Sequence, residues 1–362
     1  MSLNFRFGVM SDLHIGLPHT IADSPHRFHL VELSIPGLEV VLEHLSQLNL
    51  DFLLIPGDLT QDGEPENHEW LSQLLAQLPF PSYVIPGNHD VLSPIPTETC
   101  IGLQEFPGYY QKFGYQDPGQ LYYTCELLPG VRLIALNSNQ FDAEGHQLGL
   151  LDNEQLSWLQ RVLEKKAKDE LILVMIHHNV LEHLPDQTQN PVGRRYMLSN
   201  APQLLEILEE HDIQLVFTGH LHVQNIANQN SLYDITTGSL VSFPHPYRVV
   251  QVQQQAREVK VSIESHRLRS LPDWPDLQTT SRQMMGHRST RFMTHFLMQP
   301  PLNLPAEEAV KLAPQLKDFW ATVADGDPVV SYPELPQPIK EYFEAFSGNG
   351  VADNQLVISL TT

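Results

Sequence analysis

Five short segments of the chain end apolar, strand-like runs with side chains that can bind metal or transfer protons. The segments are VMSDLHIG, LLIPGDLT, VIPGNHD, LVMIHHN and VFTGHLH. A carboxylate, an imidazole or an amide is costly to bury without a partner, so each needs a reason to follow a buried strand. The polar side chains concerned are Asp12, His14, Asp58, Asn88, His89, Asp90, His177, His178, His220 and His222. One such segment could be an ordinary turn, but the repetition predicts that they form one site.

The ligand types in these segments indicate a divalent metal centre. Carboxylates, imidazoles and an amide oxygen suit hard to borderline ions, and the absence of thiolates in the set excludes a cysteine-type structural zinc site. In DLH and HLH, residues two apart lie on one face of an extended segment. Asp58 has two oxygens and could bridge two ions. The set is too large for one ion and suits a pair, which lie ~3.5–4 Å apart in two-metal hydrolases.

The elements that position these residues alternate between strands and helices. Strand patterns cover residues 5–10, 52–56, 83–86, 121–127, 131–137, 171–176, 214–219, 232–237, 247–253 and 258–264. Apolar residues at helical spacing cover 36–48, 153–168 and 200–211, with Asp152 and Asn200 as N-caps of the last two. This order favours an α/β domain with mixed sheets. Ligands of such sheets gather outside the carboxyl ends of the strands, where the five segments would converge.

Length and composition limit the class of protein. The 362 residues are 41% hydrophobic and 18% charged, as in a globular protein. The net charge of -22 disfavours nucleic acid as a partner, because an acidic surface repels a phosphate backbone. The two cysteines cannot form a disulfide framework. Because neither a signal peptide nor a bilayer-spanning run is visible, we expect a cytoplasmic protein without membrane contact, either a monomer or a homo-oligomer.

The composition changes near residue 265. Proline-rich segments such as SLPDWPDLQTT and PVVSYPELPQPIKEYFEAF alternate with short amphipathic pieces. We therefore predict a main domain over 1–265 and a C-terminal extension of helices and loops over 266–362 that packs on it.

The motifs DxH, GDxT, GNHD, HH and GHxH, in this order, resemble those of the calcineurin-like metallophosphoesterases. The resemblance covers residues 5 to 265 and is closest to the class III cyclic-nucleotide phosphodiesterases and their glycerophosphodiesterase relatives. It implies a four-layer αββα sandwich of two mixed β-sheets with flanking helices, with a dinuclear site at the strand ends. The expected cofactors are two divalent ions drawn from Mn, Fe, Zn or Co.

Carried over to this chain, the family's motifs assign each ligand to one of the two ions. The resemblance implies one ion on Asp12, His14, Asp58 and His222, and the other on Asp58, Asn88, His177 and His220. His177 is expected to bind in preference to His178, because the family uses the first histidine of this motif. Asn179 replaces the proline that relatives usually carry there, and LNSNQ at 136–140 lacks the aspartate that they often place before the serine.

The predicted activity is hydrolysis of a small phosphodiester, such as a cyclic nucleotide or a glycerophosphodiester, by attack of a metal-bound hydroxide. Two cations would lower the pKa of a bound water from 15.7 towards ~7. His89 is the expected general acid for the leaving alkoxide, with Asp90 orienting its imidazole. Arg194 and Arg195 are candidate substrate contacts that could equally be surface residues.

Two alternative functions stay open at this point. One is a phosphomonoesterase of the same superfamily, although GDLTQDG lacks the arginine of the protein phosphatases and GNHD ends in aspartate. Another is a non-catalytic metal-binding scaffold, which His89 and His177 disfavour. The histidines after the first motif, His19, His26 and His29, are expected to be solvated, or one of them to touch substrate.

Overall fold

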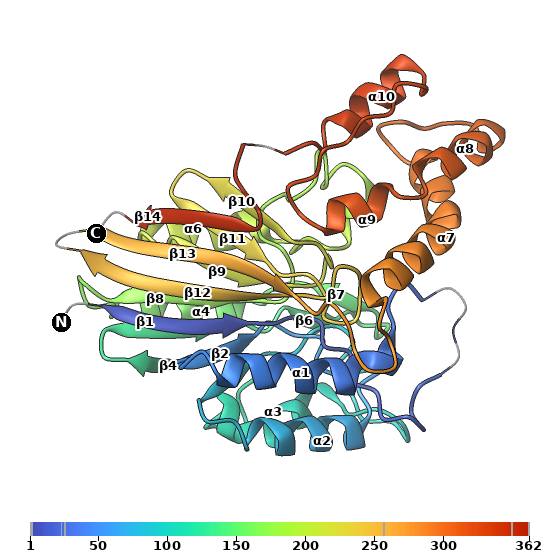
Figure 1. The fold of residues 1–362 in the computed structure, drawn as a ribbon. Helices are drawn as coiled ribbons and strands as arrows, with labels where there is room; N and C mark the ends of the chain where they lie inside the picture. Colours follow the sequence, from blue (N-terminus) through green and yellow to red (C-terminus); the bar gives the residue numbers. More distant parts are fainter. Residues whose placement is uncertain (1–2, 23, 25–26, 256–257, 349, 361–362) are drawn as a thin grey trace.

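The computed structural model describes residues 3–22, 24, 27–255, 258–348 and 350–360, and in them the strands form two large mixed sheets (Figure 1). The first sheet has the order β14 (Gln355–Leu360), β13 (Glu258–Arg267), β12 (Pro246–Gln255), β1 (Asn4–Val9), β2 (Phe52–Ile55) and β3 (Ser82–Val84). The second has the order β10 (Asn225–Gln229), β11 (Leu232–Thr236), β9 (Leu215–Thr218), β8 (Leu171–Met175), β5 (Val131–Ala135) and β4 (Tyr123–Leu128). A separate hairpin pairs β6 (Asn139–Phe141) with β7 (Gln147–Gly149).

Helices cover the outer faces of both sheets. The α-helices are α1 (Ser34–Ser46), α2 (Pro65–Leu75), α3 (Phe106–Tyr109), α4 (Asn153–Leu163), α5 (Pro191–Arg194), α6 (Ala201–Glu210), α7 (Leu277–Leu297), α8 (Ala306–Leu312), α9 (Phe319–Ala324) and α10 (Gln337–Glu344). Short 3-10 helices are η1 (Val31–Leu33), η2 (Leu103–Glu105), η3 (Gln111–Phe113) and η4 (Ala313–Leu316). Figure 1 shows α1 to α3 on one side of the molecule and α7 to α10 grouped at one end. The predicted four-layer αββα arrangement is confirmed.

The main core lies between the two sheets because the strands alternate their side chains between two faces. Phe7 of β1 stacks on Phe52 of β2 with ring centroids 4.7 Å apart, and meets Phe217 of β9 edge-on at 5.5 Å. These contacts join the first sheet to the second. Gly8, the next residue of β1, faces α1, where a Cβ atom would come within 3.5 Å of Leu45 Cδ1. On the far side, α4 and α6 pack on the outer face of the second sheet through a separate apolar cluster.

Most predicted elements lie where the sequence patterns place them. All ten predicted strand segments overlap observed strands, and the three predicted helices correspond to α1, α4 and α6. The carboxylate of Asp152 caps α4 by accepting the N–H of Gln155 at 2.7 Å. Asn200 occupies the N-cap position of α6, but its side chain bonds the backbone of Leu151 instead. Its amide therefore joins two segments and does not cap the helix.

The C-terminal residues form helices and also a strand that the sequence reading missed. Strand β14 pairs antiparallel with β13 and becomes the edge of the first sheet. Helices α7 to α10 share a buried apolar cluster with Leu221, Val223 and Phe243 of the preceding chain. The boundary at residue 265 falls within β13 and stays a prediction.

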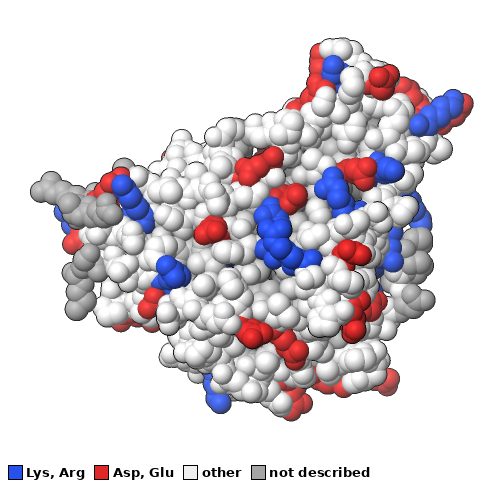
Figure 2. Space-filling view, in the orientation of Figure 1, with Lys and Arg blue, Asp and Glu red and all other residues white. Residues whose placement is uncertain are grey.

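Charged side chains are distributed over the surface without segregation by sign on the visible face. Figure 2 shows basic residues interspersed with acidic ones, although acidic residues outnumber basic ones in the chain by 43 to 21. None of the described helices combines the length and the apolar character needed to cross a bilayer.

A buried polar cluster attaches the C-terminal tail to both sheets. The Asp353 carboxylate accepts the N–H of Ile226 at 3.1 Å and that of Asp327 at 2.6 Å. The fully buried guanidinium of Arg248 donates to the carbonyls of Asp353 at 2.6 Å and Thr236 at 2.9 Å. These bonds connect β10, β11 and β12 to the segment before β14, so hydrogen bonds of buried and partly buried polar groups hold the tail.

Replacing Asp353 with alanine should lower the free energy of unfolding by about 2–4 kcal/mol. The change leaves the buried N–H of Ile226 and the partly buried N–H of Asp327 without an acceptor, and a buried group without a partner costs about 1–3 kcal/mol. Urea denaturation followed by circular dichroism measures the loss. The matched control is Asp273→Ala, an exposed aspartate of the same C-terminal region. A change below about 0.5 kcal/mol for Asp353→Ala, the range of ordinary surface substitutions, would contradict a structural role for the cluster.

Candidate metal centre

The five polar segments meet at one edge of the paired sheets. Strands β1, β2 and β3 run parallel in the first sheet, and β8 and β9 run parallel in the second. Each ends within a few residues of a candidate ligand, so their carboxyl ends deliver the side chains to one place. A cavity of about 490 Å³ opens there, lined in part by Asp58, Asn88, His89, His220 and His222.

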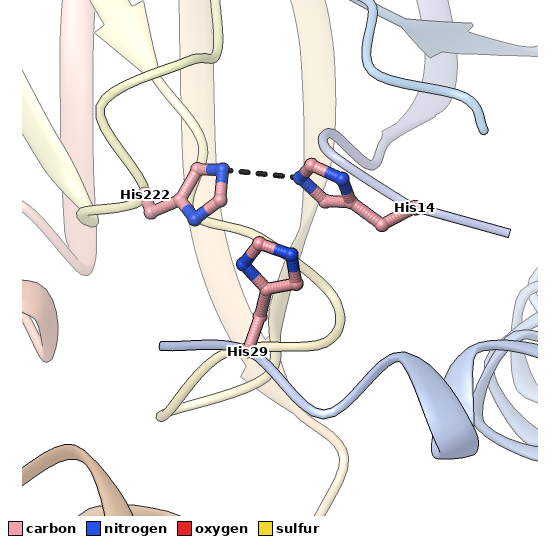
Figure 3. A group of neighbouring side chains, drawn as sticks. All are labelled: His14, His29 and His222. Atoms are coloured by element: carbon pink, nitrogen blue, oxygen red, sulfur yellow. Dashed lines mark hydrogen bonds between the residues drawn. The ribbon is translucent and has the colours of Figure 1, made fainter. Parts of the chain in front are cut away.

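The first cluster contains the ligands expected for one ion. Ligand atoms of Asp12, His14, Asp58 and His222 all lie within 4.8 Å of one another. His14 Nε2 is 3.3 Å from His222 Nε2, and His222 Nε2 is 3.0 Å from Asp12 Oδ1. Figure 3 shows the imidazoles of His14 and His222 pointing toward each other, with His29 beside them. A buried and a partly buried imidazole nitrogen that face one another beside two buried carboxylates form a pocket suited to a cation.

The second cluster contains the ligands expected for the other ion. Asp58, His177 and His220 offer atoms within 4.8 Å of one another. His177 Nε2 lies 3.4 Å from Asp58 Oδ2 and 3.2 Å from Asn88 Oδ1. The opposite nitrogen of His177, Nδ1, donates to the carbonyl of Pro56 at 2.8 Å, which leaves Nε2 free to bind an ion. Likewise, His220 Nε2 donates to the carbonyl of Arg195 at 3.3 Å, so Nδ1 is its free nitrogen.

Asp58 belongs to both clusters, and two glycines make room for it. Its Oδ1 accepts the N–H of His89 at 2.8 Å, which fixes the carboxylate between the clusters. A Cβ on Gly87 would lie 2.2 Å from that same oxygen, and one on Gly57 would lie 2.5 Å from His177 Nδ1. Gly57 also has a φ of +95°, which side-chain-bearing residues rarely adopt. The glycines of the GD and GN pairs therefore allow close approach of the loops.

Five of the candidate ligands share an unusual backbone conformation. Positive φ angles occur at Asp12 (52°), His14 (45°), Asp58 (50°), His220 (67°) and His222 (58°). Such conformations cost about 1–3 kcal/mol each in residues other than glycine and concentrate at functional sites. The loops that carry these five ligands therefore hold a costly backbone conformation, as is common at functional sites.

Burial and mutual charge shift the pKa values of these groups. Burial lowers the pKa of His14 and of His220 well below the ordinary value, with neighbouring imidazoles adding to the effect. Burial also acts to lower the pKa of His177, but Asp58 outweighs it and raises that pKa to about 9. The pKa of Asp58 is well below its usual range because nearby imidazoles, His177 first, outweigh burial. This site concentrates anionic and lone-pair groups that a divalent cation would stabilise.

Asp90 has a different set of partners from the one predicted. Its carboxylate accepts the backbone N–H groups of Leu59 at 3.0 Å, Thr60 at 2.8 Å and Gly87 at 2.8 Å. It thus joins the GDLT loop to the GNHD loop, and the expectation that it orients the His89 imidazole is corrected. Burial, followed by the charge of Asp58, raises the pKa of Asp90 to about 7.

Gln61, which the sequence reading did not select, holds two imidazoles at the cavity. Its carbonyl accepts from His89 Nδ1 at 2.7 Å, and its side-chain oxygen accepts from His29 Nε2 at 3.1 Å. His29 stacks on His14 with ring centroids 4.4 Å apart, and its ligand atom lies within 4.8 Å of those of His14 and His222. His29 is thus part of the site, whereas His19 pairs with Glu66 at the surface and His26 lies outside the described residues.

The remaining predicted residues take separate positions. Arg195 lines the cavity, whereas Arg194 ends the short helix α5 and is not among the lining residues described. His178 lines the cavity and its Nδ1 is hydrogen-bonded to Ser138 Oγ at 2.8 Å. Asn179, in the place of the usual proline, is buried and donates to Thr218 Oγ1 at 3.0 Å, which ties the loop to the end of β9.

The donor set fits divalent metal ions. It combines carboxylate oxygens and imidazole nitrogens, buried or partly buried, that lie within 4.8 Å of one another in each of the two clusters, with the amide oxygen of Asn88 beside the second. Nδ1 of His177 has a carbonyl partner of the kind that commonly orients metal-binding imidazoles.

Comparisons with known proteins agree with this geometry. The family model for calcineurin-like phosphoesterases matches residues 5–224. A probable cyclic nucleotide phosphodiesterase of Synechococcus sp. is 31% identical over 188 residues, which are 52% of this chain and 64% of that protein. A probable glycerophosphodiester phosphodiesterase of Arcobacter nitrofigilis is 27% identical over 194 residues, which are 52% of this chain and 63% of that protein. The matches therefore span less than two thirds of the length of either relative.

Among solved structures, the fold is similar to that of a dimetal phosphatase from Danio rerio. The TM-score is 0.52 at 14% sequence identity, over 71% of this chain and 95% of that one. At this identity the likeness concerns the fold.

Proposed function

We propose that this chain, which belongs to the calcineurin-like phosphoesterase family, hydrolyses small phosphodiesters with two divalent metal ions. The observation that carries the proposal is the pair of buried clusters that share Asp58. One ion would be held by Asp12, His14, Asp58 and His222. The second would be held by Asp58, Asn88, His177 and His220. Of the metals expected from the sequence, Mn, Fe, Zn and Co all suit these nitrogen and oxygen ligands.

The chain's own residues supply the rest of the mechanism. When bound, the ions would supply Lewis acidity that neutralises phosphate oxygens and activates water. Asp58 belongs to both clusters, and the N–H of His89 fixes the position of its carboxylate between them. His89 lines the cavity, and its Nδ1–H donates to Gln61, which directs the ring and leaves Nε2 as its second nitrogen. From there a protonated His89 can transfer its proton to the departing oxygen of the ester.

The proposed substrate class rests on the names of the relatives. Relatives named as cyclic nucleotide and glycerophosphodiester phosphodiesterases support a small phosphodiester over a monoester. The test is a panel of phosphomonoesters and phosphodiesters, assayed with metal-stripped protein to which Mn, Fe, Zn or Co is added. We expect diesters to be hydrolysed faster than monoesters, and only with added ion. A preference for monoesters would favour a phosphomonoesterase, and inactivity despite bound ions would favour a metal-binding scaffold.

Metal binding should also stabilise the fold. Ions that bind only the folded state at about 100 times their dissociation constant add about 2.7 kcal/mol to stability. Metal-stripped protein titrated with Mn²⁺ should therefore unfold at a higher temperature and bind two ions per chain by elemental analysis. His177→Ala should bind one ion fewer, whereas His287→Ala, at an exposed position of α7, should bind as the wild type does. A wild-type protein that saturates with a single ion would contradict the dinuclear proposal.

A further inference from the structure

One wall of the cavity consists of aromatic rings, two of which come from the C-terminal helices. Phe292 lies in α7 and Trp320 in α9, with ring centroids 5.5 Å apart. Phe28, from the loop before η1, meets Phe292 edge-on at 5.7 Å. All three line the cavity that contains the candidate ligands. Phe292 and Trp320 lie beyond residue 224, where the family match ends, so that match does not account for them.

The aromatic wall adjoins both clusters. Phe28 directly precedes His29, whose ring stacks on His14 of the first cluster. On the other side, the ring of Tyr196 lies 5.1 Å from that of His220 in the second cluster. A phosphate held between the clusters would therefore have aromatic surface next to it.

The packing of the extension holds this wall at a fixed distance from the clusters. Leu221, between His220 and His222, is buried in the same apolar cluster as Trp320. The N–H of Gln224 donates to the carbonyl of Ala324, the last residue of α9, at 3.0 Å. Movement of α9 would therefore move the loop that carries both histidines.

The charges around the cavity suit an anion that carries a planar group. Among the described lining residues, the arginines are Arg27 and Arg195, and the carboxylate is Asp58. The guanidinium of Arg195 lies over the ring of Tyr196 at 4.7 Å and forms a flat cationic surface. Arg27 donates to the carbonyl of His29 at 3.0 Å and pairs with Glu32, so its side chain is fixed. Flat cationic and aromatic surfaces bind planar π systems well, and a glycerol chain has no such face.

We infer that Phe28, Phe292 and Trp320 form a subsite for a planar aromatic group on the alcohol of the phosphoester, an inference that rests on the proposed function. The volume of about 490 Å³ lies within the ~300–1,000 Å³ typical of small-molecule sites. The aromatic group is either a nucleobase or a simple aryl ring, which share the π face that the wall recognises. The C-terminal extension would thereby select the substrate, while the strand ends carry the chemistry.

The test compares ligands that differ in the aromatic group. Calorimetric titration of the Mn²⁺-loaded full chain would use AMP, phenyl phosphate and ribose 5-phosphate, the last being AMP without its base. We expect AMP to bind about tenfold more tightly than ribose 5-phosphate, as stacking of a base on aromatic side chains allows. If phenyl phosphate binds as tightly as AMP, the subsite accepts any aryl ring. If phenyl phosphate binds more weakly than AMP, the subsite is specific for a nucleobase.

Leucine variants of the aromatic wall test which residues cause the preference for AMP over ribose 5-phosphate. Trp320→Leu and Phe292→Leu should each lower the affinity for AMP by about tenfold. The affinity for ribose 5-phosphate and the number of bound Mn²⁺ ions should stay unchanged. Trp158→Leu is the matched control, because this tryptophan of α4 packs against Tyr122, away from the cavity. Trp320 is buried, so its replacement could lower the stability of the fold. Phe292 is only half-buried, so Phe292→Leu tests the subsite with less effect on stability.

Two results would overturn the subsite. One is equal affinity for AMP and ribose 5-phosphate, or no binding of AMP. The other is an unchanged preference for AMP in both leucine variants. Because the readout is binding and not turnover, these results are independent of the proposed function: an enzyme that hydrolyses diesters without any preference for an aromatic group would refute the subsite alone.

Discussion

Replacing Asp58 with alanine should lower kcat/KM for a model phosphodiester by about 10³-fold. Asp58 Oδ2 lies 3.8 Å from His14 Nε2 in one cluster and 3.4 Å from His177 Nε2 in the other. Loss of this carboxylate would weaken both proposed ion sites at once. A bound ion contributes several kcal/mol of transition-state stabilisation, and a loss of about 4 kcal/mol corresponds to about 10³-fold.

The measurement combines kinetics with elemental analysis of the purified variant. Asp58→Asn separates folding from charge, because the amide oxygen can still accept the N–H of His89. We expect Asp58→Asn to stay folded, to bind fewer ions than the wild type and to lose nearly as much activity as the alanine variant. Asp169→Ala is the control, since this exposed aspartate lies in the turn before β8 and belongs to neither ligand cluster. Two ions still bound to Asp58→Ala would rule out the bridging role.

The candidate ligands could be predicted from the sequence because their signal is local. Each follows a run of apolar residues, and such runs predict buried strands whatever their partners are. Parallel strands then place their ends together, which is why Asp12, Asp58 and His177 from distant segments become neighbours. The positive φ angles of Asp12 and Asp58 were not foreseen, since non-glycine residues rarely adopt them.

The partners of these residues depend on contacts across loops and could not be predicted. The sequence around Asp90 does not indicate which donors it would bind. In the fold, its carboxylate accepts three N–H groups from two loops. In the sequence, His29 is one of several histidines in the same loop. In the fold, its ring stacks on that of His14. Gln61 follows GDLT directly and gave no signal of its own, because the bonds that it makes go to residues 28 and 32 positions away.

The C-terminal region illustrates a different limit. The segment QLVISL is rich in β-branched and apolar residues and could have been recognised as strand β14. Its pairing with β13 about a hundred residues earlier has no local signature. Similarly, Trp320 is buried in the apolar cluster of the extension and Phe292 packs against that cluster, as ordinary core residues do. Only the tertiary arrangement shows that they also line the cavity.

His89→Ala should leave metal binding intact and lower activity by an amount that depends on the leaving group. His89 is not in either candidate ligand cluster, although its N–H fixes Asp58. That bond comes from the backbone and survives the substitution. General acid catalysis typically contributes about 10²–10⁴-fold. An alkoxide from glycerol or a ribose needs a proton to depart, whereas p-nitrophenolate is stable without one.

We therefore expect a loss of about 10²-fold or more on a diester with an alkoxide leaving group, and a much smaller loss on bis(p-nitrophenyl) phosphate. His89→Gln retains a polar side chain that has no acidic proton to transfer, and it should behave like the alanine variant. His19→Ala, which removes an exposed histidine paired with Glu66, is the control. Equal losses on both substrates, with the full metal content retained, would show that the imidazole positions the phosphate. In that case the proton for the leaving alkoxide would have to come from another group at the cavity, and the part of the mechanism assigned here to His89 Nε2 would be wrong.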